Sequence, residues 1–388
     1  MPIASKLPDV GTTIFTVMSR RARELGALNL GQGFPDYDID PRITQLVTAA
    51  MASGHNQYAP MEGSADLRAQ IAQKIAWCYR VAVDPDAEIT ITLGATEALY
   101  SVIQATVGPT DEVILFDPSY DSYDPAVRLA GGRAVRLPLR LPDFGYDWDR
   151  VRAAITPRTR LIIINSPHNP ACTVMSAADL DALAAVINGR DILVLSDEVY
   201  EHVVFDGRAH CSVLAHAELR ARSFAVFSFG KTLHATGIRV GYCVAPAELT
   251  RELRKVHQFN TFSIAHPLQY AIAAYLQQAP ETWQNLASFF QAKRDRLRAA
   301  LAGSGFILPA AAGTYFQLLD FSALDSRDDQ GFAERLLTEA GVATIPLAPF
   351  YAVPPRLAVV RLCVAKLDAT LDAGAARLRA FAQKLTRT

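Results

Sequence analysis

Short apolar runs alternate with amphipathic stretches through the middle of the chain. The runs cover residues 88–93 (EITITL), 112–117 (EVILFD), 161–165 (LIIIN), 192–196 (ILVLS) and 224–228 (FAVFS). Runs this short, and rich in Ile, Val, Leu and Phe, predict strands that are buried on both faces. The amphipathic stretches between them, such as GATEALYSVIQATV after the first run, predict connecting helices. The alternation is typical of an α/β domain with a mostly parallel sheet covered by helices.

The pattern changes after about residue 280. A long helical stretch (FFQAKRDRLRAALAG) leads to a strand-like GTYFQLLDF, a helical GFAERLLTEAG, a strand-like AVVRLCVA and a last helix. We interpret this part as a smaller α+β domain that the N-terminal segment joins. We therefore expect a large domain over residues 45–283 and a small domain over residues 1–44 and 284–388.

Composition narrows the class of protein. Of 388 residues, 50% are hydrophobic and 20% are charged, and the net charge of −1 gives no field that would recruit nucleic acid. No apolar run reaches the ~20 residues of a membrane span, and the start, MPIASKLPDVG, lacks the apolar core of a secretory signal. The five cysteines are scattered without a CxxC or a Cys/His cluster, so we expect reduced thiols and no metal site. We expect a cytoplasmic enzyme with neither nucleic-acid nor membrane partners.

Polar side chains gather where the predicted strands end. NSPHNP starts at the end of LIIIN, DEVY follows ILVLS, and SFGK starts at the last residue of FAVFS. In an open parallel sheet, ligands bind beyond the carboxyl ends of the strands. We therefore expect these three clusters to form one site.

The stretch SFGKTLHATGIRVGY contains Gly-Lys-Thr, as the end of a nucleotide-binding P-loop does. A P-loop also requires a glycine five residues before Gly230, where this chain has Ala225 inside a predicted strand. No GxGxxG follows a strand either. The sequence therefore disfavours nucleoside triphosphates and dinucleotides as ligands.

Lys231 allows two interpretations. A lysine taken alone is most often a solvated loop residue. Here Ser228 and Arg239 offer the hydroxyl and guanidinium that bind a phosphate monoester, and Gly237 and Gly241 would permit close backbone approach. Burial and a nearby cation would lower the pKa of the lysine and make its amine nucleophilic toward an aldehyde. A small aldehyde that carries a phosphate is pyridoxal 5′-phosphate.

The pattern S-x-G-K-x(7)-R-V-G resembles the cofactor-lysine signature of the class I aminotransferases. Nine stretches follow the order of that family: GQGFPD, NQYAPMEG, TLGATEAL, FDPSYDSY, NSPHNPAC, SDEVYEH, SFGKT, GTYFQL and VVRLCVA. The set resembles the branch with the methionine aminotransferases and the kynurenine/glutamine transaminases. The resemblance implies the type I fold of pyridoxal-phosphate enzymes, with a mostly parallel seven-stranded sheet, a smaller α+β domain, and a homodimer with shared active sites.

The resemblance also assigns cofactor-binding residues. Lys231 would form a Schiff base with the cofactor and later act as general base. Asp197 would pair with the ring nitrogen, although an aspartate at a strand end is also a common helix N-cap. Tyr200 and Asn169 would donate to the cofactor phenolate oxygen, and Asn169 in Asn-Pro is also a common turn residue.

Further residues would hold the ring and the phosphate. Tyr120 would stack on the pyridine ring. The backbone N–H groups of Ala95 and Thr96 would bind the phosphate at a helix N-terminus, together with Ser228. Tyr58 would reach the phosphate from the partner subunit.

For the substrate, the resemblance implies that Arg361 binds the α-carboxylate, beside Asn169 and the backbone of Gly33. The alternative is an edge-strand arginine that faces solvent. The expected side-chain pocket is apolar or aromatic; its candidate residues are Ile14, Phe15, Tyr58, Phe350 and Tyr351.

We therefore expect an aminotransferase that moves the amino group of L-methionine, and of other apolar or aromatic amino acids, to a 2-oxo acid by a ping-pong mechanism. The preference for methionine rests on the resemblance. One alternative is a kynurenine/glutamine-type transaminase with cysteine-conjugate β-lyase activity. A transcription regulator on the same fold is disfavoured, because the 30 residues before GQGFPD lack the length and charge of a helix-turn-helix.

Overall fold

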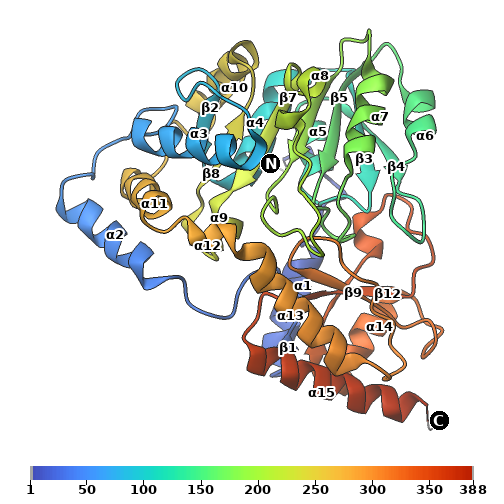
Figure 1. Cartoon of the computed structure of the whole chain (residues 1–388). Coiled ribbons are helices and arrows are strands. Elements are labelled where there is room, and N and C mark those ends of the chain that lie inside the picture. The colour runs from blue at the N-terminus through green and yellow to red at the C-terminus, as the bar shows by residue number, and fades with distance from the viewer. Residues whose placement is uncertain (1–2, 387–388) are drawn as a thin grey trace.

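A seven-stranded sheet forms the centre of the computed structural model, which describes residues 3–386 (Figure 1). In spatial order its strands are β2 (Ile89–Thr92), β8 (Gly241–Val244), β7 (Ser223–Ser228), β6 (Leu193–Asp197), β5 (Thr159–Asn165), β3 (Glu112–Asp117) and β4 (Arg133–Pro138). Strand β8 runs antiparallel to β2 and β7, and the other neighbours are parallel. The expected mostly parallel, seven-stranded sheet is confirmed.

The five apolar runs correspond to five of these strands, which are almost entirely buried. Strand β5 shows why: Leu161 and Ile163 pack into one hydrophobic core, and Ile162 and Ile164 into the core on the other face. Strands β4 and β8 were not predicted. Strand β4 is an edge strand with partly exposed positions, and β8 is a four-residue strand that begins with glycine.

Helices cover both faces of the sheet. One face packs against α4 (Gly94–Thr106), α5 (Tyr123–Leu129) and α10 (Ala247–Asn260). The other packs against α3 (Ala65–Tyr79), α6 (Trp148–Ala154), α7 (Ala177–Ile187), α8 (Ala217–Arg220) and α11 (His266–Gln278), with α2 (Pro41–Ala52) against α11. Short helices follow at α9 (Phe229–Thr232) and α12 (Glu281–Gln284). Between residues 3 and 386, no helix combines the length and apolarity that crossing a bilayer requires.

A smaller α+β layer lies below the large sheet in Figure 1. Its antiparallel sheet has the order β11 (Ile345–Pro346), β12 (Val359–Cys363), β9 (Phe316–Asp320), and β1 (Leu28–Asn29) pairs in parallel with β10 (Val342–Ala343). Its helices are α1 (Ile14–Glu24), α13 (Leu286–Leu301), α14 (Asp329–Arg335), a π-helical turn (Leu336–Ala340) and α15 (Asp368–Leu385). The N-terminal segment therefore packs with the C-terminal part of the chain.

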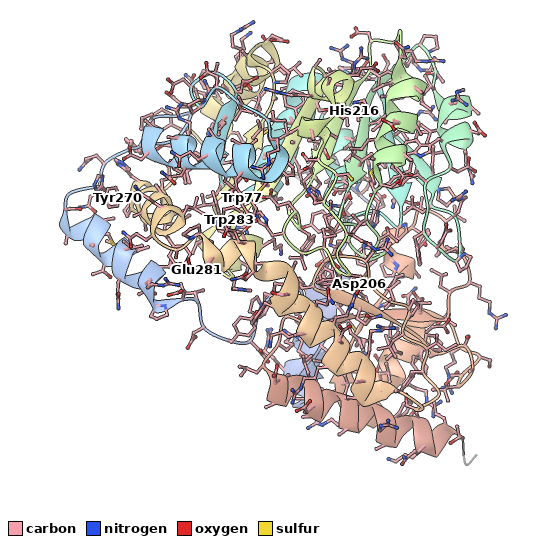
Figure 2. All side chains as sticks on the ribbon, viewed as in Figure 1. Trp77, Asp206, His216, Tyr270, Glu281 and Trp283 are labelled. Atoms are coloured by element: carbon pink, nitrogen blue, oxygen red, sulfur yellow. The ribbon has the colours of Figure 1, made fainter. Side chains whose placement is uncertain are left out.

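Helix α13 is tied through Arg294 to the loop that contains Asp206 and to the segment before β9. Arg294, whose side chain is 2% exposed, donates to both carboxylate oxygens of Asp206 and to the backbone oxygen of Ala311 (Figure 2). Near the start of the same helix, Trp77 and Trp283 meet edge to face with ring centroids 5.0 Å apart.

Candidate active site

The three polar clusters meet in one pocket at the carboxyl ends of β5, β6 and β7, beside the N-terminus of α4. The pocket encloses about 160 Å³. Its lining residues are Ala95, Thr96, Leu99, Tyr120, Asn165, Asn169, Asp197, Val199, Tyr200, Ser228, Lys231 and Arg239. Nine of the residues predicted to bind the cofactor are therefore brought together, and Tyr58 is not among them.

Lys231 lies in α9, three residues after the end of β7, with Ala225 inside the strand as expected. Its Nζ donates to the hydroxyl of Tyr315 at 2.8 Å. Burial lowers the pKa of Lys231 to about 8, and the positive charges of Arg239 and Arg361 add to this effect. The lysine is thus a partly buried side chain with a hydrogen-bonded amine, much of it neutral near pH 8, rather than a solvated loop residue.

Asp197 is the last residue of β6 and is 4% exposed. Its Oδ2 accepts from the Tyr123 hydroxyl at 2.7 Å, and its Oδ1 accepts from the backbone N–H of Val199 at 3.3 Å. A turn, not a helix, follows the strand, so the N-cap alternative is wrong. Burial raises the pKa of Asp197 to about 6, although the Tyr123 hydroxyl opposes the shift.

At the opposite end of the pocket, the structure provides an anion cradle. Helix α4 begins at Gly94 without a side-chain cap, so its first N–H groups point into the pocket region unopposed. A Cβ on Gly94 would lie 2.7 Å from Nη2 of Arg239, and a Cβ on Gly241 would lie 2.7 Å from the backbone oxygen of Phe227. A Cβ on Gly237 would meet no protein atom within 4 Å, so the close backbone approach expected there stays a prediction.

Glu97, one turn into α4, does not compete with an anion in this cradle. Its Oε1 accepts from the Ser101 hydroxyl at 2.6 Å and lies 3.0 Å from Nδ1 of His257. Its Oε2 accepts from the backbone N–H of Leu93 at 3.1 Å. The carboxylate therefore binds the N–H of the N-cap residue Leu93, and the N–H groups of Ala95 and Thr96, which line the pocket, are not among its partners.

Arg361 lies on β12, the middle strand of the small sheet, and is fully buried. Its Nη1 donates to Oδ1 of Asn169, its Nη2 donates to the backbone oxygen of Gly31 at 3.1 Å, and its guanidinium lies 3.7 Å from the ring centre of Phe316. Among residues 3–386, no hydrogen-bond partner is found for its Nε. The alternative of a solvent-facing edge arginine is wrong.

The loop that carries Gly33 closes against these residues. The Tyr315 hydroxyl donates to the backbone oxygen of Gly33 at 2.6 Å. A Cβ on Gly33 would lie 2.9 Å from the tip of the Phe316 ring, so this position requires glycine. The structure thus brings Gly33, Arg361 and Asn169 to one place.

A wider cavity of about 900 Å³ opens next to the pocket and shares Thr96 and Arg239 with it. Ile14 and Phe350 line it as predicted, and the ring of Phe15 lies 5.5 Å from that of Phe350. Arg239 is the one cationic side chain among its described lining residues. Phe15 and Tyr351 are not among the lining residues of this cavity, so their place in the substrate pocket stays a prediction.

Tyr58 lies outside both cavities. Its side chain is 80% exposed and packs edge to face on Phe262, with ring centroids 5.2 Å apart. The shallow hollow around it is formed by residues 56–58 and 263–267. Within one chain, Tyr58 therefore contacts none of the other predicted cofactor residues.

Three contact residues had not been predicted. Tyr123 and Tyr315 bind Asp197 and Lys231 as described, and Asn165 donates through Nδ2 to the backbone oxygen of Asp197 at 2.8 Å. All three lie in stretches that carried the family resemblance: FDPSYDSY, GTYFQL and NSPHNPAC. The sequence therefore marked these stretches as part of the family pattern, but it did not indicate which residue each of the three side chains contacts.

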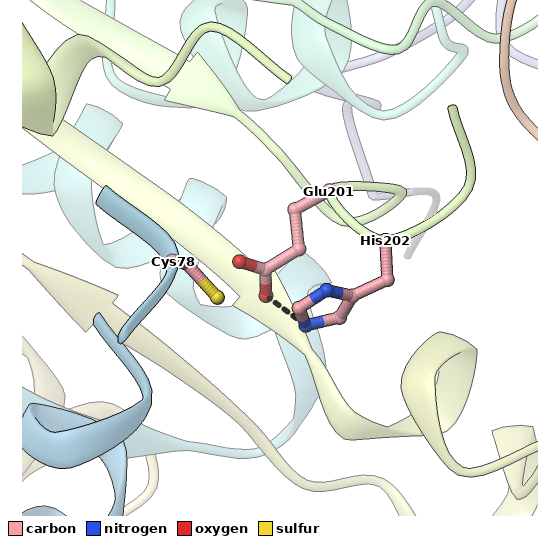
Figure 3. Close-up of side chains that lie close together, drawn as sticks. All are labelled: Cys78, Glu201 and His202. Carbon is pink, nitrogen blue, oxygen red and sulfur yellow. Dashed lines mark ion pairs between the residues drawn. The ribbon is translucent and has the colours of Figure 1, made fainter. Parts of the chain in front are cut away.

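A cluster of metal-ligand type lies behind the pocket, where Cys78, Glu201 and His202 have ligand atoms within 4.8 Å of one another (Figure 3). Burial raises the pKa of Cys78 to about 12 and lowers that of His202 to about 3. Against the cost of burial, the Lys74 ammonium, 2.5 Å away, lowers the pKa of Glu201 to about 2. Lys74 therefore already supplies the positive charge that Glu201 requires.

Comparisons with known proteins point to one family. Residues 26–378 match the family described as aminotransferase class I and II. The chain is 51% identical over 375 residues to the methionine aminotransferase of Escherichia coli (strain K12), with 97% of each sequence covered. The crystal structure of YbdL from Escherichia coli, described as a methionine aminotransferase, aligns with a TM-score of 0.96 at 50% identity over 98% of this chain and 100% of the other.

Two further relatives are more distant. A probable N-succinyldiaminopimelate aminotransferase of Mycobacterium tuberculosis is 39% identical over 392 residues, with 98% of each covered. The kynurenine–oxoglutarate transaminase 1 of Mus musculus is 30% identical over 409 residues, covering 97% of this chain and 96% of the relative. The chain therefore belongs to the class I and II aminotransferase family, and it is a pyridoxal-phosphate-dependent aminotransferase with the type I fold.

Proposed function

We propose that the enzyme transfers the amino group of L-methionine, and of other apolar or aromatic amino acids, to a 2-oxo acid. One observation carries the substrate class: apolar and aromatic side chains, among them Ile14, Leu93 and Phe350, line the wide cavity beside the pocket together with neutral and acidic residues, and Arg239 is its one cationic lining residue within residues 3–386. Because Arg239 would bind the cofactor phosphate, a carboxylate at the far end of a substrate would have no cationic partner there. The 51% identity to a methionine aminotransferase supports methionine within this class.

The pocket residues fit pyridoxal phosphate at each of its functional groups. Lys231 would bind the aldehyde, Asp197 the ring nitrogen, and Tyr120 the ring face. The hydroxyl of Tyr200 and the amide of Asn169 would donate to the phenolate oxygen. The phosphate would lie in the cradle formed by Ala95, Thr96, Ser228 and Arg239, where the uncapped helix N-terminus and the two glycines without room for a Cβ leave space for an anion.

When bound, the cofactor supplies a carbonyl that condenses with amines and a ring that withdraws electrons from the substrate α-carbon. Asp197 would hold a proton on the ring nitrogen, because its carboxylate is buried and its second oxygen is already bonded to Tyr123. The amine of Lys231 would take the proton from the α-carbon, and its lowered pKa keeps much of it unprotonated near pH 8.

Arg361 would orient the substrate. A guanidinium binds a carboxylate through two parallel hydrogen bonds, and that geometry fixes the direction of the α C–H bond. The Nε without a partner is a donor that a substrate carboxylate would use. Gly33 lies beside it, with its backbone close to Phe316. Phe15, 5.1 Å from the guanidinium, and Phe350 would contact the substrate side chain.

We also propose a homodimer in the cytoplasm. Tyr58, Phe259 and Phe262 are exposed to 80%, 86% and 48%, and a second copy of the chain would cover them. Tyr58 would then reach the phosphate in the pocket of the other copy, so each site would be complete only in the dimer. Residues 45–283 would move as the large domain, and residues 1–44 with 284–388 as the small domain.

The test is a visible absorption spectrum of the purified enzyme before and after addition of L-methionine. We expect the band of the lysine-bound cofactor to fade with L-methionine and to return with a 2-oxo acid. L-aspartate should change the band at least tenfold more slowly, because Arg239 would already bind the cofactor phosphate and the cavity has no second cation for the distal carboxylate of aspartate. Faster conversion of aspartate would refute the proposed substrate class, and pyruvate and ammonia from a cysteine conjugate without an oxo acid would reveal β-lyase activity.

A further inference from the structure

We propose that Tyr315 is a positioning residue: its hydroxyl holds the amine of Lys231 and ties it to the loop that carries Gly33. This inference rests on the proposed role of Lys231. The Tyr315 side chain is buried to 1% exposure, 84 positions along the chain from the lysine. Its hydroxyl lies 2.8 Å from Nζ of Lys231 and 2.6 Å from the backbone oxygen of Gly33.

The direction of these two hydrogen bonds follows from counting protons. A phenol has one proton, and a backbone carbonyl can only accept, so the Tyr315 hydroxyl donates its proton to the backbone oxygen of Gly33. Toward Lys231 the hydroxyl can therefore only accept. Burial raises the pKa of Tyr315 well above its usual value, so the phenol keeps its proton over the whole working range of the enzyme. Tyr315 thus fixes one N–H of the lysine in every protonation state of the amine.

The backbone around Tyr315 is built to aim this hydroxyl. Thr314 has a φ of +68°, which is uncommon for a β-branched residue, and its N–H bonds to the backbone oxygen of Val203 at 2.8 Å. A Cβ on Gly313 would lie 2.8 Å from the same oxygen. The tyrosine ring is then packed by Tyr200 and Phe290, with centroids 5.0 and 5.5 Å away. These two rings therefore pack against the Tyr315 ring and support its orientation.

The contact joins the two halves of the proposed site. Gly33 lies two residues from Gly31, whose backbone oxygen accepts from Arg361. One hydroxyl therefore connects the proposed base to the loop beside the proposed carboxylate site. A lysine held in this way keeps its lone pair in a fixed direction, whereas a free lysine side chain would sample several rotamers.

A purely structural role would not alter the titration of Lys231, and this difference allows a test. The charged or titratable groups that face the amine are Asp197, Arg239, Arg361, Cys363, Tyr200 and Tyr315. An acceptor stabilises an ammonium more than a neutral amine, because hydrogen bonds to charged groups are stronger. Removal of the Tyr315 hydroxyl should therefore lower the pKa of Lys231, by about half to one unit.

The experiment compares wild type with Tyr315→Phe in the full chain. Cofactor-free protein is mixed with pyridoxal phosphate, and the rate of appearance of the lysine-bound band is followed from pH 6 to 10. We expect a midpoint near 8 for wild type and a midpoint lower by about half to one unit for the variant. In the loaded enzyme, the rate constant of the half-reaction with L-methionine should fall about tenfold.

The matched control is Tyr275→Phe. Tyr275 is a buried tyrosine whose hydroxyl donates to Asp40 at 2.9 Å, and it lies in neither cavity. This control should leave the midpoint and the rate constant unchanged. If Tyr315→Phe does not fold, 3-fluorotyrosine at position 315 keeps the shape and weakens the acceptor, and the midpoint should move in the same direction.

Two failures are distinguishable. If wild type and Lys231→Ala acquire the same band, the proposed role of the lysine is refuted and this inference with it. If Lys231→Ala acquires none, but Tyr315→Phe shows the wild-type midpoint or a higher one, the proposed function stands and only the positioning role of Tyr315 is overturned.

Discussion

Replacement of Arg361 by lysine tests the proposed carboxylate site most directly. Arg361→Lys keeps the positive charge in the same buried strand but removes the planar fork. In the structure this fork donates to Asn169 and to the backbone of Gly31, and its Nε is left for a ligand. A lysine presents a single ammonium on a flexible stem and cannot reproduce this arrangement.

The size of the effect follows from the bonds that are lost. A hydrogen bond to a charged group contributes about 1.5–3 kcal/mol, and the substitution removes at least one such bond to the carboxylate. A loss of about 2–3 kcal/mol corresponds to a reduction in kcat/KM of about 30- to 150-fold. Damage to the contacts with Asn169 and Gly31 would add to this value, so a second substrate is needed to separate the two causes.

L-Methioninamide, which lacks the carboxylate, provides that second substrate. Half-reaction rates are measured for L-methionine and its amide with wild type and with Arg361→Lys, and the preference for methionine is compared. We expect this preference to shrink about 30- to 150-fold in the variant. The control Arg356→Lys changes an exposed arginine that donates only to the backbone oxygen of Ser326, and it should leave the preference unchanged.

An unchanged preference in Arg361→Lys would refute the reasoning. In that case both substrates would lose activity equally, and Arg361 would act through the packing of β12 rather than through the carboxylate.

Four further predictions follow from the buried groups of the site. Lys231→Ala should abolish transamination and leave the thermal unfolding curve of the cofactor-free protein intact; substantial turnover would remove the lysine from its role. Lys74→Met should lower the free energy of unfolding by about 3–5 kcal/mol, because it strands the buried Glu201 carboxylate. The double variant Lys74→Met/Glu201→Leu should recover most of that loss in a denaturant titration. If it loses as much stability as Lys74→Met, the cost does not come from an unpaired Glu201 carboxylate. Gly94→Ala, at a φ of +70° beside Arg239, should weaken cofactor retention more than tenfold, whereas Gly54→Ala, at a φ of +92° with open space around it, should not change retention. In cofactor-free protein the folded state keeps the Asp197 proton up to about pH 6, whereas the unfolded chain loses it near pH 4. The free energy of unfolding should therefore decrease as the pH rises from about 4 to about 6, and this decrease should be absent in Asp197→Asn.

The parts of the molecule that could be predicted from sequence are those that depend on chain order. Strand β3 has the predicted bounds, because its apolar run is fully buried and the polar residues at both ends mark where the strand begins and ends. Asp197, Ser228 and Asn169 meet because parallel strands bring their carboxyl ends to one edge, so position along a strand becomes position in space.

Side-chain contacts between elements that are far apart in the sequence could not be predicted in this way. The partners Tyr123 and Asp197 are 74 residues apart, and Tyr315 and Lys231 are 84 apart. Whether a tyrosine hydroxyl ends at a carboxylate or in a hydrophobic core depends on packing that no local pattern encodes. The same reason applies to Phe350 and Tyr351, which were both predicted for the pocket: only Phe350 lines the wide cavity, and the direction of one short turn decides this.

The pairing of β1 with β10 sets an order for synthesis and folding of the enzyme. Leu28 lies opposite Val342, so the first strand that the ribosome makes waits for more than three hundred residues before its partner emerges. The seven strands of the large sheet are complete at Val244. This sheet can therefore form before β10 and β11, which pack against α1, have been synthesised. Arg361 and the loop of Gly33 come together only at the very end. A nascent chain could therefore acquire the proposed cofactor pocket well before it acquires the proposed grip on its substrate.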